Sequence, residues 1–136
     1  MKRTAPMMPS KTCNWHTPKA LYEDLDSEFH FTDDPCPEGG MFGLDRTWGL
    51  SVFCNPPYGR GVDRWISKGI AEARSGSIVV VFLLPARTDT RWFHDLILPN
   101  ASDIRFLQGR QQFTKNGVPG RCPFPSMIVI FRGDKS

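Results

Sequence analysis

The residues with the clearest chemical potential are Asn55-Pro56-Pro57-Tyr58, which directly follow a short apolar strand predicted over Val52-Phe53-Cys54. Neither proline has an N–H and both have a fixed φ, so this corner cannot continue into a sheet ladder or a helix. Its carbonyl oxygens are therefore left to accept hydrogen bonds. The corner presents one side-chain amide, backbone acceptors and one aromatic ring.

These groups suit an exocyclic amine such as N6 of adenine, whose lone pair is delocalised into the ring and is a poor nucleophile. The side-chain oxygen of Asn55 and the backbone oxygen of Pro56 would accept its two hydrogens and turn the lone pair toward an electrophile. Tyr58 would stack on the face of a base swung out of its duplex. We therefore predict that Asn55, Pro56, Pro57 and Tyr58 form a catalytic corner.

Alternating strand and helix patterns surround the corner and predict an α/β fold. Thr17 and Pro18 have the types of an N-cap and a first helical residue, and an apolar stripe continues that helix to about Ser27. Helical spacing predicts further helices over residues 62–74 and 90–98. The unbroken apolar run 77–84 is typical of a strand in a mostly parallel sheet, and residues 104–107 and 127–131 predict a final antiparallel pair.

A further strand is predicted over residues 29–32, and Asp33-Asp34-Pro35-Cys36 ends it. A carboxylate at the carboxyl end of the first strand of an α/β sheet lies where ligands of such sheets bind. The alternative is a simple turn aspartate. Only about twenty residues separate Asp34 from Asn55, which leaves room for few further strands or helices between them.

Two basic stretches are candidates for binding a polyanion. Arg60 lies in the glycine-flanked link after the corner, where a solvated surface residue is the alternative. Residues 108–126 form a long connection that interleaves basic and aromatic side chains, which suits a nucleic-acid clamp as well as a plain surface loop. The predicted DNA-binding residues are Arg60, Arg110, Lys115 and Arg121.

Composition narrows the class of protein. The 136 residues, 40% hydrophobic and 23% charged, predict one globular domain over residues 1–136, with a loose arm over residues 1–14. The net charge of +3 permits a polyanionic partner. The four cysteines lack zinc-ligand spacing, and no membrane span or signal peptide is evident. We expect no metal, a cytoplasmic location, and a monomer or weak dimer.

Beyond the corner, several motifs resemble, in type and order, those of the phage-type DNA N6-adenine methyltransferases, the Dam-like family of phages and prophages. The resemblance spans about residues 14 to 131. It is carried by Trp15-His16-Thr17-Pro18, Glu28-Phe29 with Phe31, Asp34-Pro35-Cys36, Trp65, Leu84 to Thr90, Gly109-Arg110 with Phe113, and Pro125-Ser126.

The resemblance implies a Rossmann-like fold that uses S-adenosylmethionine to methylate adenine N6 in DNA. A full methyltransferase sheet has two more strands and their helices between positions equivalent to Asp34 and Asn55, so we predict a trimmed version of that fold. It implies cofactor contacts at Trp15, Thr17, Pro18, Asp34, Pro35 and Cys36, and it favours Asp34 over Asp33. A plain helix cap with a packing tryptophan remains the alternative for Trp15 and Thr17. Methyl transfer would proceed by direct in-line displacement without a metal or a covalent enzyme intermediate.

Three rival functions stay open. The same tetrapeptide suits enzymes that methylate protein glutamine or RNA adenine, because both present a planar, amide-like nitrogen. A non-catalytic module that binds single-stranded nucleic acid would use the same aromatic and basic residues. A degenerate methyltransferase fold kept as an interaction partner is the third.

Overall fold

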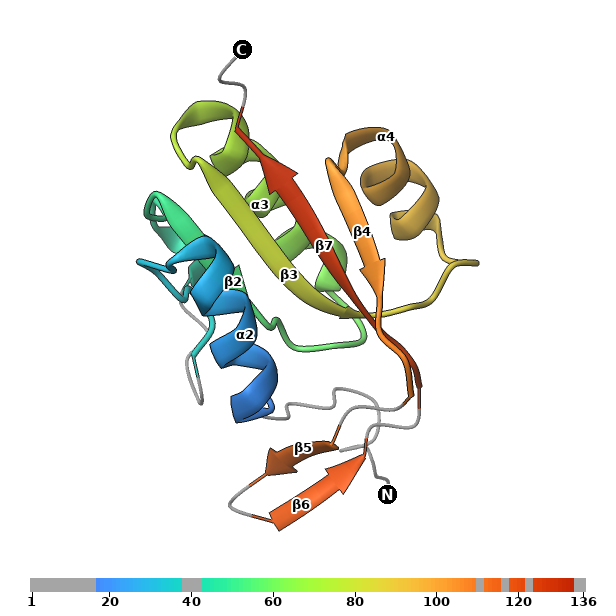
Figure 1. The fold of residues 1–136 in the computed structure, drawn as a ribbon. Helices are drawn as coiled ribbons and strands as arrows, with labels where there is room; N and C mark the ends of the chain where they lie inside the picture. The colour runs from blue at the N-terminus through green and yellow to red at the C-terminus, as the bar shows by residue number, and fades with distance from the viewer. Residues whose placement is uncertain (1–16, 38–42, 110–111, 116–117, 122–123, 134–136) are drawn as a thin grey trace.

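The structure, a computed structural model, describes residues 17–37, 43–109, 112–115, 118–121 and 124–133, with backbone only from 112 to 121. Figure 1 shows a sheet with helices on both sides. In chain order the elements are α2 (Lys19–Phe29), η1 (Gly43–Asp45), β2 (Ser51–Cys54), α3 (Val62–Ser75), β3 (Val79–Pro85), η2 (Phe93–Ile97), α4 (Leu98–Asn100), β4 (Asp103–Phe106), β5 (Gln112–Lys115), β6 (Val118–Arg121) and β7 (Ser126–Arg132).

The main sheet is mixed, so the prediction of a mostly parallel, Rossmann-like sheet is wrong. Its order is β2-β3-β7-β4, and among these described strands β2 pairs parallel with β3 while β7 pairs antiparallel with both β3 and β4. The α/β class and the antiparallel pair of β4 with β7 are confirmed. The apolar run of β3 correctly indicated burial on both faces, but such burial does not fix the direction of the neighbouring strand.

Alternate residues of the strands enter two cores, one on each face of the sheet. Val80, Phe82 and Leu84 pack with α3 and η2, whereas Val81 and Leu83 pack on the side of Leu25 in α2. Figure 1 shows α2 and α3 on opposite sides of the sheet. The predicted helix 62–74 is confirmed as α3. The sheet is therefore packed between two helical layers.

The start and end of α2 differ from the sequence prediction. The helix begins at Lys19 with Pro18 as its N-cap, without a side-chain cap, so Thr17 is not the capping residue. It ends at Phe29, and His30 follows in the left-handed region with φ 53°. The predicted strand 29–32 is reduced to one parallel bridge between Asp33 and Val52. Between Asp34 and Asn55 the described elements are η1 and β2.

Part of the predicted loop 108–126 is a hairpin in which β5 and β6 pair antiparallel, with Lys115 opposite Val118. In Figure 1 this hairpin lies apart from the main sheet, beyond the end toward which β4 points. The sequence carried a signal for it, because Asn116-Gly117 is the dipeptide that two-residue hairpin connections favour. No helix in the described ranges is both long and apolar enough to cross a membrane.

The contact of α3 with β3 gives a stability prediction. A methyl group at Gly69 would overlap with the ring of Phe82, which is fully buried. We expect Gly69→Ala to lower the free energy of unfolding by about 1–3 kcal/mol, the usual cost of overpacking a core. Denaturant unfolding measures it. Gly76→Ala is the control, because nothing lies within 4 Å of the added methyl, and an equal loss in both variants would contradict the prediction.

Candidate active site

The corner Asn55-Pro56-Pro57-Tyr58 lies at the carboxyl end of β2, as its sequence position requires. Asn55 and Pro57 are half-buried, whereas Pro56 and Tyr58 are buried. Gly59 and Gly61, which follow, have φ angles of 107° and 95°, a region that favours glycine, so the chain can turn sharply into α3. The corner therefore lies between a buried strand and a helix whose inner face is buried.

Asn55 makes a contact that the sequence did not predict. Its side-chain Nδ2 donates to the hydroxyl oxygen of Thr17 at 3.0 Å, across 38 positions of sequence. The segment before α2 and the Asn55-Pro56-Pro57-Tyr58 corner are thus joined directly. Thr17 and Asn55, predicted for cofactor and substrate respectively, lie side by side.

The proline carbonyls match the chemistry predicted for the corner. Within the described ranges, neither the Pro56 nor the Pro57 carbonyl oxygen accepts a hydrogen bond. Acceptors that lack a partner in the protein can bind the N–H groups of a ligand.

Tyr58 is buried rather than presented to solvent, with 3% of its surface exposed. Its hydroxyl donates to the Leu83 carbonyl oxygen at 3.0 Å, at the end of β3. Burial raises the pKa of Tyr58 well above its ordinary value, so the hydroxyl stays protonated. This bond fixes the ring at the edge of the sheet where the corner lies.

Phe124 is the aromatic neighbour of Tyr58. The two rings meet edge to face with their centroids 5.6 Å apart, and the Arg87 guanidinium lies 5.0 Å from the centroid of Phe124. The sequence placed Phe124 in a nucleic-acid clamp and gave it no contact with the corner. Phe124 and Tyr58 therefore form an aromatic pair beside the corner.

Asp33 and Asp34 have opposite environments. The Arg46 guanidinium donates to both carboxylate oxygens of Asp33 at 2.8 Å and 2.8 Å, and this lowers the pKa of Asp33. Asp34 is half-buried, and burial raises its pKa, although the Cys36 backbone N–H donates to Oδ1 at 3.2 Å and opposes the shift. Asp33 therefore forms an ion pair with Arg46. Asp34 forms no ion pair with a described residue.

Asp34 lies close to the corner because Asp33 forms the parallel bridge with Val52, and Phe53 N–H donates to the Asp33 carbonyl oxygen at 3.0 Å. Pro35 is buried, and a methyl group at Gly43 would overlap with its carbonyl oxygen. Burial raises the pKa of Cys36 to about 11, so this thiol is protonated at neutral pH and is not a nucleophile.

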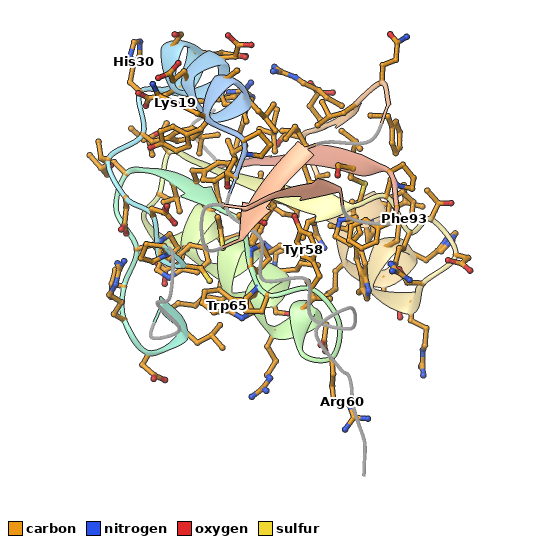
Figure 2. All side chains as sticks on the ribbon, turned by 90° about the horizontal axis from the view of Figure 1, so that it is seen from below. Lys19, His30, Tyr58, Arg60, Trp65 and Phe93 are labelled. Carbon is orange, nitrogen blue, oxygen red and sulfur yellow. The ribbon has the colours of Figure 1, made fainter. Side chains whose placement is uncertain are left out.

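Other predicted site residues are placed differently. Pro18 precedes α2 and is half-buried. Arg60 is exposed and points away from the body of the molecule in Figure 2, which also labels Tyr58. Trp15, the arm 1–14 and Arg110 lie outside the described residues, as do the side chains of Lys115 and Arg121, whose backbones belong to the hairpin.

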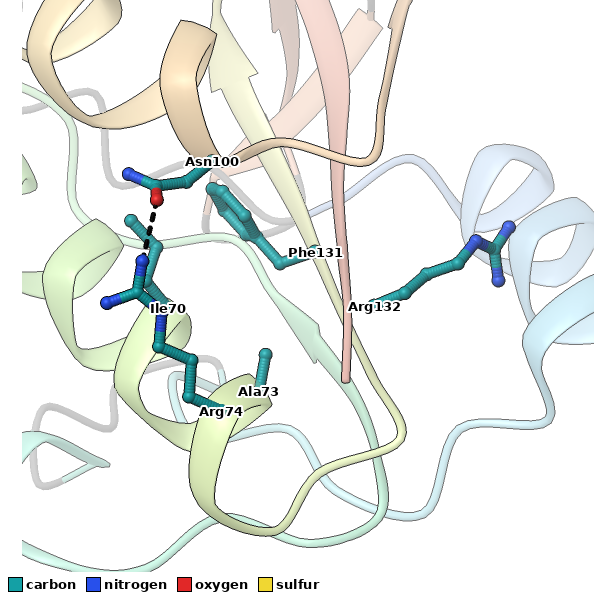
Figure 3. Close-up of a pocket in the computed structure, with 6 residues that line it drawn as sticks. All are labelled: Ile70, Ala73, Arg74, Asn100, Phe131 and Arg132. Atoms are coloured by element: carbon teal, nitrogen blue, oxygen red, sulfur yellow. Dashed lines mark hydrogen bonds between the residues drawn. The ribbon is translucent and has the colours of Figure 1, made fainter. Parts of the chain in front are cut away.

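A pocket of about 60 Å³ lies at the opposite edge of the sheet, where β7 ends. Figure 3 shows Arg74 bonded to Asn100 there, while the Arg132 side chain points away. Its volume is below the several hundred Å³ typical of ligand sites. No group of three or more potential metal ligands occurs among the described residues.

Comparison with known proteins identifies the family. The chain matches the family model described as DNA N-6-adenine-methyltransferase (Dam) over residues 42–136, more than half of its length. The matched range includes the corner and all the strands of the main sheet. Neither a curated protein nor a solved structure gives a significant match. Because this match covers more than half of the sequence, the chain belongs to the Dam family of DNA N6-adenine methyltransferases.

Proposed function

We propose that the chain methylates the exocyclic N6 of a flipped adenine in DNA at a specific site, with S-adenosylmethionine as the methyl donor. The observation that carries the proposal is the corner itself. It combines a half-buried Asn55 with a Pro56 carbonyl that has no partner in the described chain, at the edge of the sheet where Asp34 also lies. Family membership supports the reaction class.

The roles of the corner follow from hydrogen-bond chemistry. The Asn55 side-chain oxygen and the Pro56 carbonyl oxygen each accept one hydrogen of N6, which holds the nitrogen and turns its lone pair outward. Pro57 keeps the turn rigid, because its ring fixes φ. Much of the rate enhancement comes from this alignment, since a held nucleophile needs little further activation. The proton lost from N6 passes to solvent once the nitrogen carries its new substituent.

The base-binding part of the site is aromatic. Tyr58 offers a ring fixed by its bond to Leu83, and Phe124 occupies the space at its edge. Entry of adenine requires Phe124 to give way and then allows it to pack on the base. Stacking of this kind recognises a base swung out of its duplex.

The residues near Asp34 fit the proposed donor. S-adenosylmethionine supplies a methyl group already activated by the positive charge on sulfur. Asp34 is a half-buried carboxylate with a raised pKa, so a cationic or hydroxyl-bearing ligand would stabilise its charged form. Pro35 and Cys36 continue this segment, and Thr17 and Pro18, which precede α2, are proposed as further cofactor contacts on the family resemblance, with Thr17 bonded to Asn55. Trp15 is proposed as a further cofactor contact on the family resemblance.

The DNA contacts are proposed from charge and position. Arg60 is exposed beside the corner, and the hairpin that carries Lys115 and Arg121 lies beyond the sheet (Figure 1). Together with Arg110, these side chains would contact phosphates and hold the duplex while one base is extruded.

Expression of the chain in cells that lack adenine methylation tests the proposal. Mass spectrometry of hydrolysed DNA should find N6-methyladenine in expressing cells and none in cells with an empty vector. Methylated RNA adenine or protein glutamine without methylated DNA would favour a rival substrate. Binding of nucleic acid without any methylated product would favour a non-catalytic module.

A further inference from the structure

We infer that Thr17 is a positioning residue that sets the orientation of the Asn55 amide. The inference rests on the proposed function of Asn55 and adds a role that a cofactor contact does not require. Its basis is the bond from Asn55 Nδ2 to Thr17 Oγ1 at 3.0 Å, which joins two segments far apart in sequence.

The orientation of this amide decides whether the corner can work. Asn55 carries an acceptor oxygen and a donor NH₂ on opposite sides of one planar group. Binding N6 of adenine requires the oxygen to face the substrate, because the reversed amide would set NH₂ against NH₂. Donation from Nδ2 to Thr17 places the donor on the Thr17 side and therefore directs Oδ1 the other way. Proline carbonyls need no such control, because the backbone fixes them.

Both ends of this hydrogen bond are held by packing. On the Thr17 side, Tyr22 N–H donates to the Pro18 carbonyl oxygen at 3.0 Å, which ties the segment to the first turn of α2. On the Asn55 side, Phe53 of β2 meets the Tyr22 ring edge to face at 5.2 Å. One side chain of α2 thus contacts the strand that leads into the corner, so the position of Thr17 relative to Asn55 is fixed.

The far end of α2 is also anchored. Arg105 of β4 donates to both carboxylate oxygens of Glu28 at 2.7 Å and 2.7 Å, and its guanidinium lies 5.6 Å from the centroid of the Phe29 ring. Leu25 between these ends is buried. The helix is therefore held to the sheet along its length, and Thr17 directly precedes its N-cap, Pro18, whose carbonyl oxygen is bonded into the first turn.

Replacing Thr17 both in the parent protein and in the Asn55→Asp variant separates the orientation of the Asn55 amide from other roles of Thr17. In Asn55→Asp both side-chain atoms are acceptors, so the orientation of the group no longer matters, and the Thr17 hydroxyl can donate to either oxygen. We expect Thr17→Val to lower kcat by about tenfold when Asn55 is present, the scale of one lost hydrogen bond. In the Asn55→Asp background the same change should cost less than about threefold. Thr17→Ser keeps the hydroxyl and should restore the parent kcat.

A second measurement does not depend on activity. The side-chain amide of Asn55, observed by ¹H–¹⁵N NMR in the protein without DNA or donor, should shift and exchange faster with solvent in Thr17→Val but not in Thr17→Ser. It decides the question even if Asn55→Asp is inactive. If the chain transfers no methyl group at all, the proposed function fails while this coupling can still be measured.

Three results would overturn the inference. One is an equal loss of kcat from Thr17→Val in both backgrounds. Another is an unchanged Asn55 amide signal in Thr17→Val. The third is a loss confined to the dissociation constant of S-adenosylmethionine by calorimetry, which would make Thr17 a cofactor contact only.

Discussion

Replacement of Asn55 by alanine should reduce methyl transfer by about 100–1000-fold, the usual effect of removing one preorganised hydrogen-bonding group from an active site. The expected loss is in kcat, because in the proposed mechanism the Asn55 oxygen binds the reacting nitrogen. Binding of S-adenosylmethionine should weaken much less, since Asp34 is the group proposed to hold it. Single-turnover rates with labelled donor and calorimetric binding measure the two effects separately.

Asn100→Ala is the matched control for this substitution. Asn100 is also half-buried and hydrogen-bonded, to Arg74 and to the Leu96 carbonyl oxygen, but it lies at the opposite edge of the sheet. Its replacement should leave methyl transfer unchanged. Equal rates for parent and Asn55→Ala would remove Asn55 from the mechanism.

Asp34→Asn should weaken S-adenosylmethionine binding by about 30-fold or more, because losing one partner of a desolvated charge pair costs roughly 2–5 kcal/mol.

The same Asp34→Asn change should make the free protein more stable at neutral pH. Burial raises the pKa of Asp34 in the folded state, so its charged form opposes folding above that pKa, and the penalty disappears as pH falls through it. Cofactor affinity in the parent should fall over that same acidic range.

Asp33→Asn is expected to change stability in the opposite direction. Arg46 lowers the pKa of Asp33, so its carboxylate stabilises the fold above the unfolded-state pKa, and this contribution is lost as pH falls through the lowered value. Thermal melts of both variants at pH 7, with calorimetry of cofactor binding, compare the neighbours directly. A melting temperature that falls in Asp34→Asn would contradict the assignment of Asp34 as a functional carboxylate held at a cost in stability.

The local frame of the site could be predicted from the sequence. The apolar stretch before Asn55 and the helical spacing from Val62 gave β2 and α3 close to their observed bounds. The buried run of β3 was equally clear. These signals are local, because the spacing of apolar residues within one segment indicates whether that segment is a buried strand or a helix with one buried face.

The remaining features depend on contacts between distant segments. Nothing in the pattern of β3 indicates that β7 inserts beside it in the antiparallel sense. The Thr17 hydroxyl has the chemistry of a helix cap. It accepts a hydrogen bond from Asn55 instead, because α2 packs on β2. Phe124 likewise reaches Tyr58 through the return of the chain into β7. The hairpin, by contrast, has a local signal in Asn116-Gly117.

The most direct test uses purified protein, DNA and S-adenosylmethionine carrying a deuterated methyl group. The account predicts that mass spectrometry of the hydrolysed DNA will find the intact deuterated methyl on N6 of adenine, and that Asn55→Ala will lower its initial rate of appearance by about 100-fold or more. Label in protein or RNA instead, or in DNA to the same level with Asn55→Ala, would contradict the central claim that this corner presents adenine N6 for methylation.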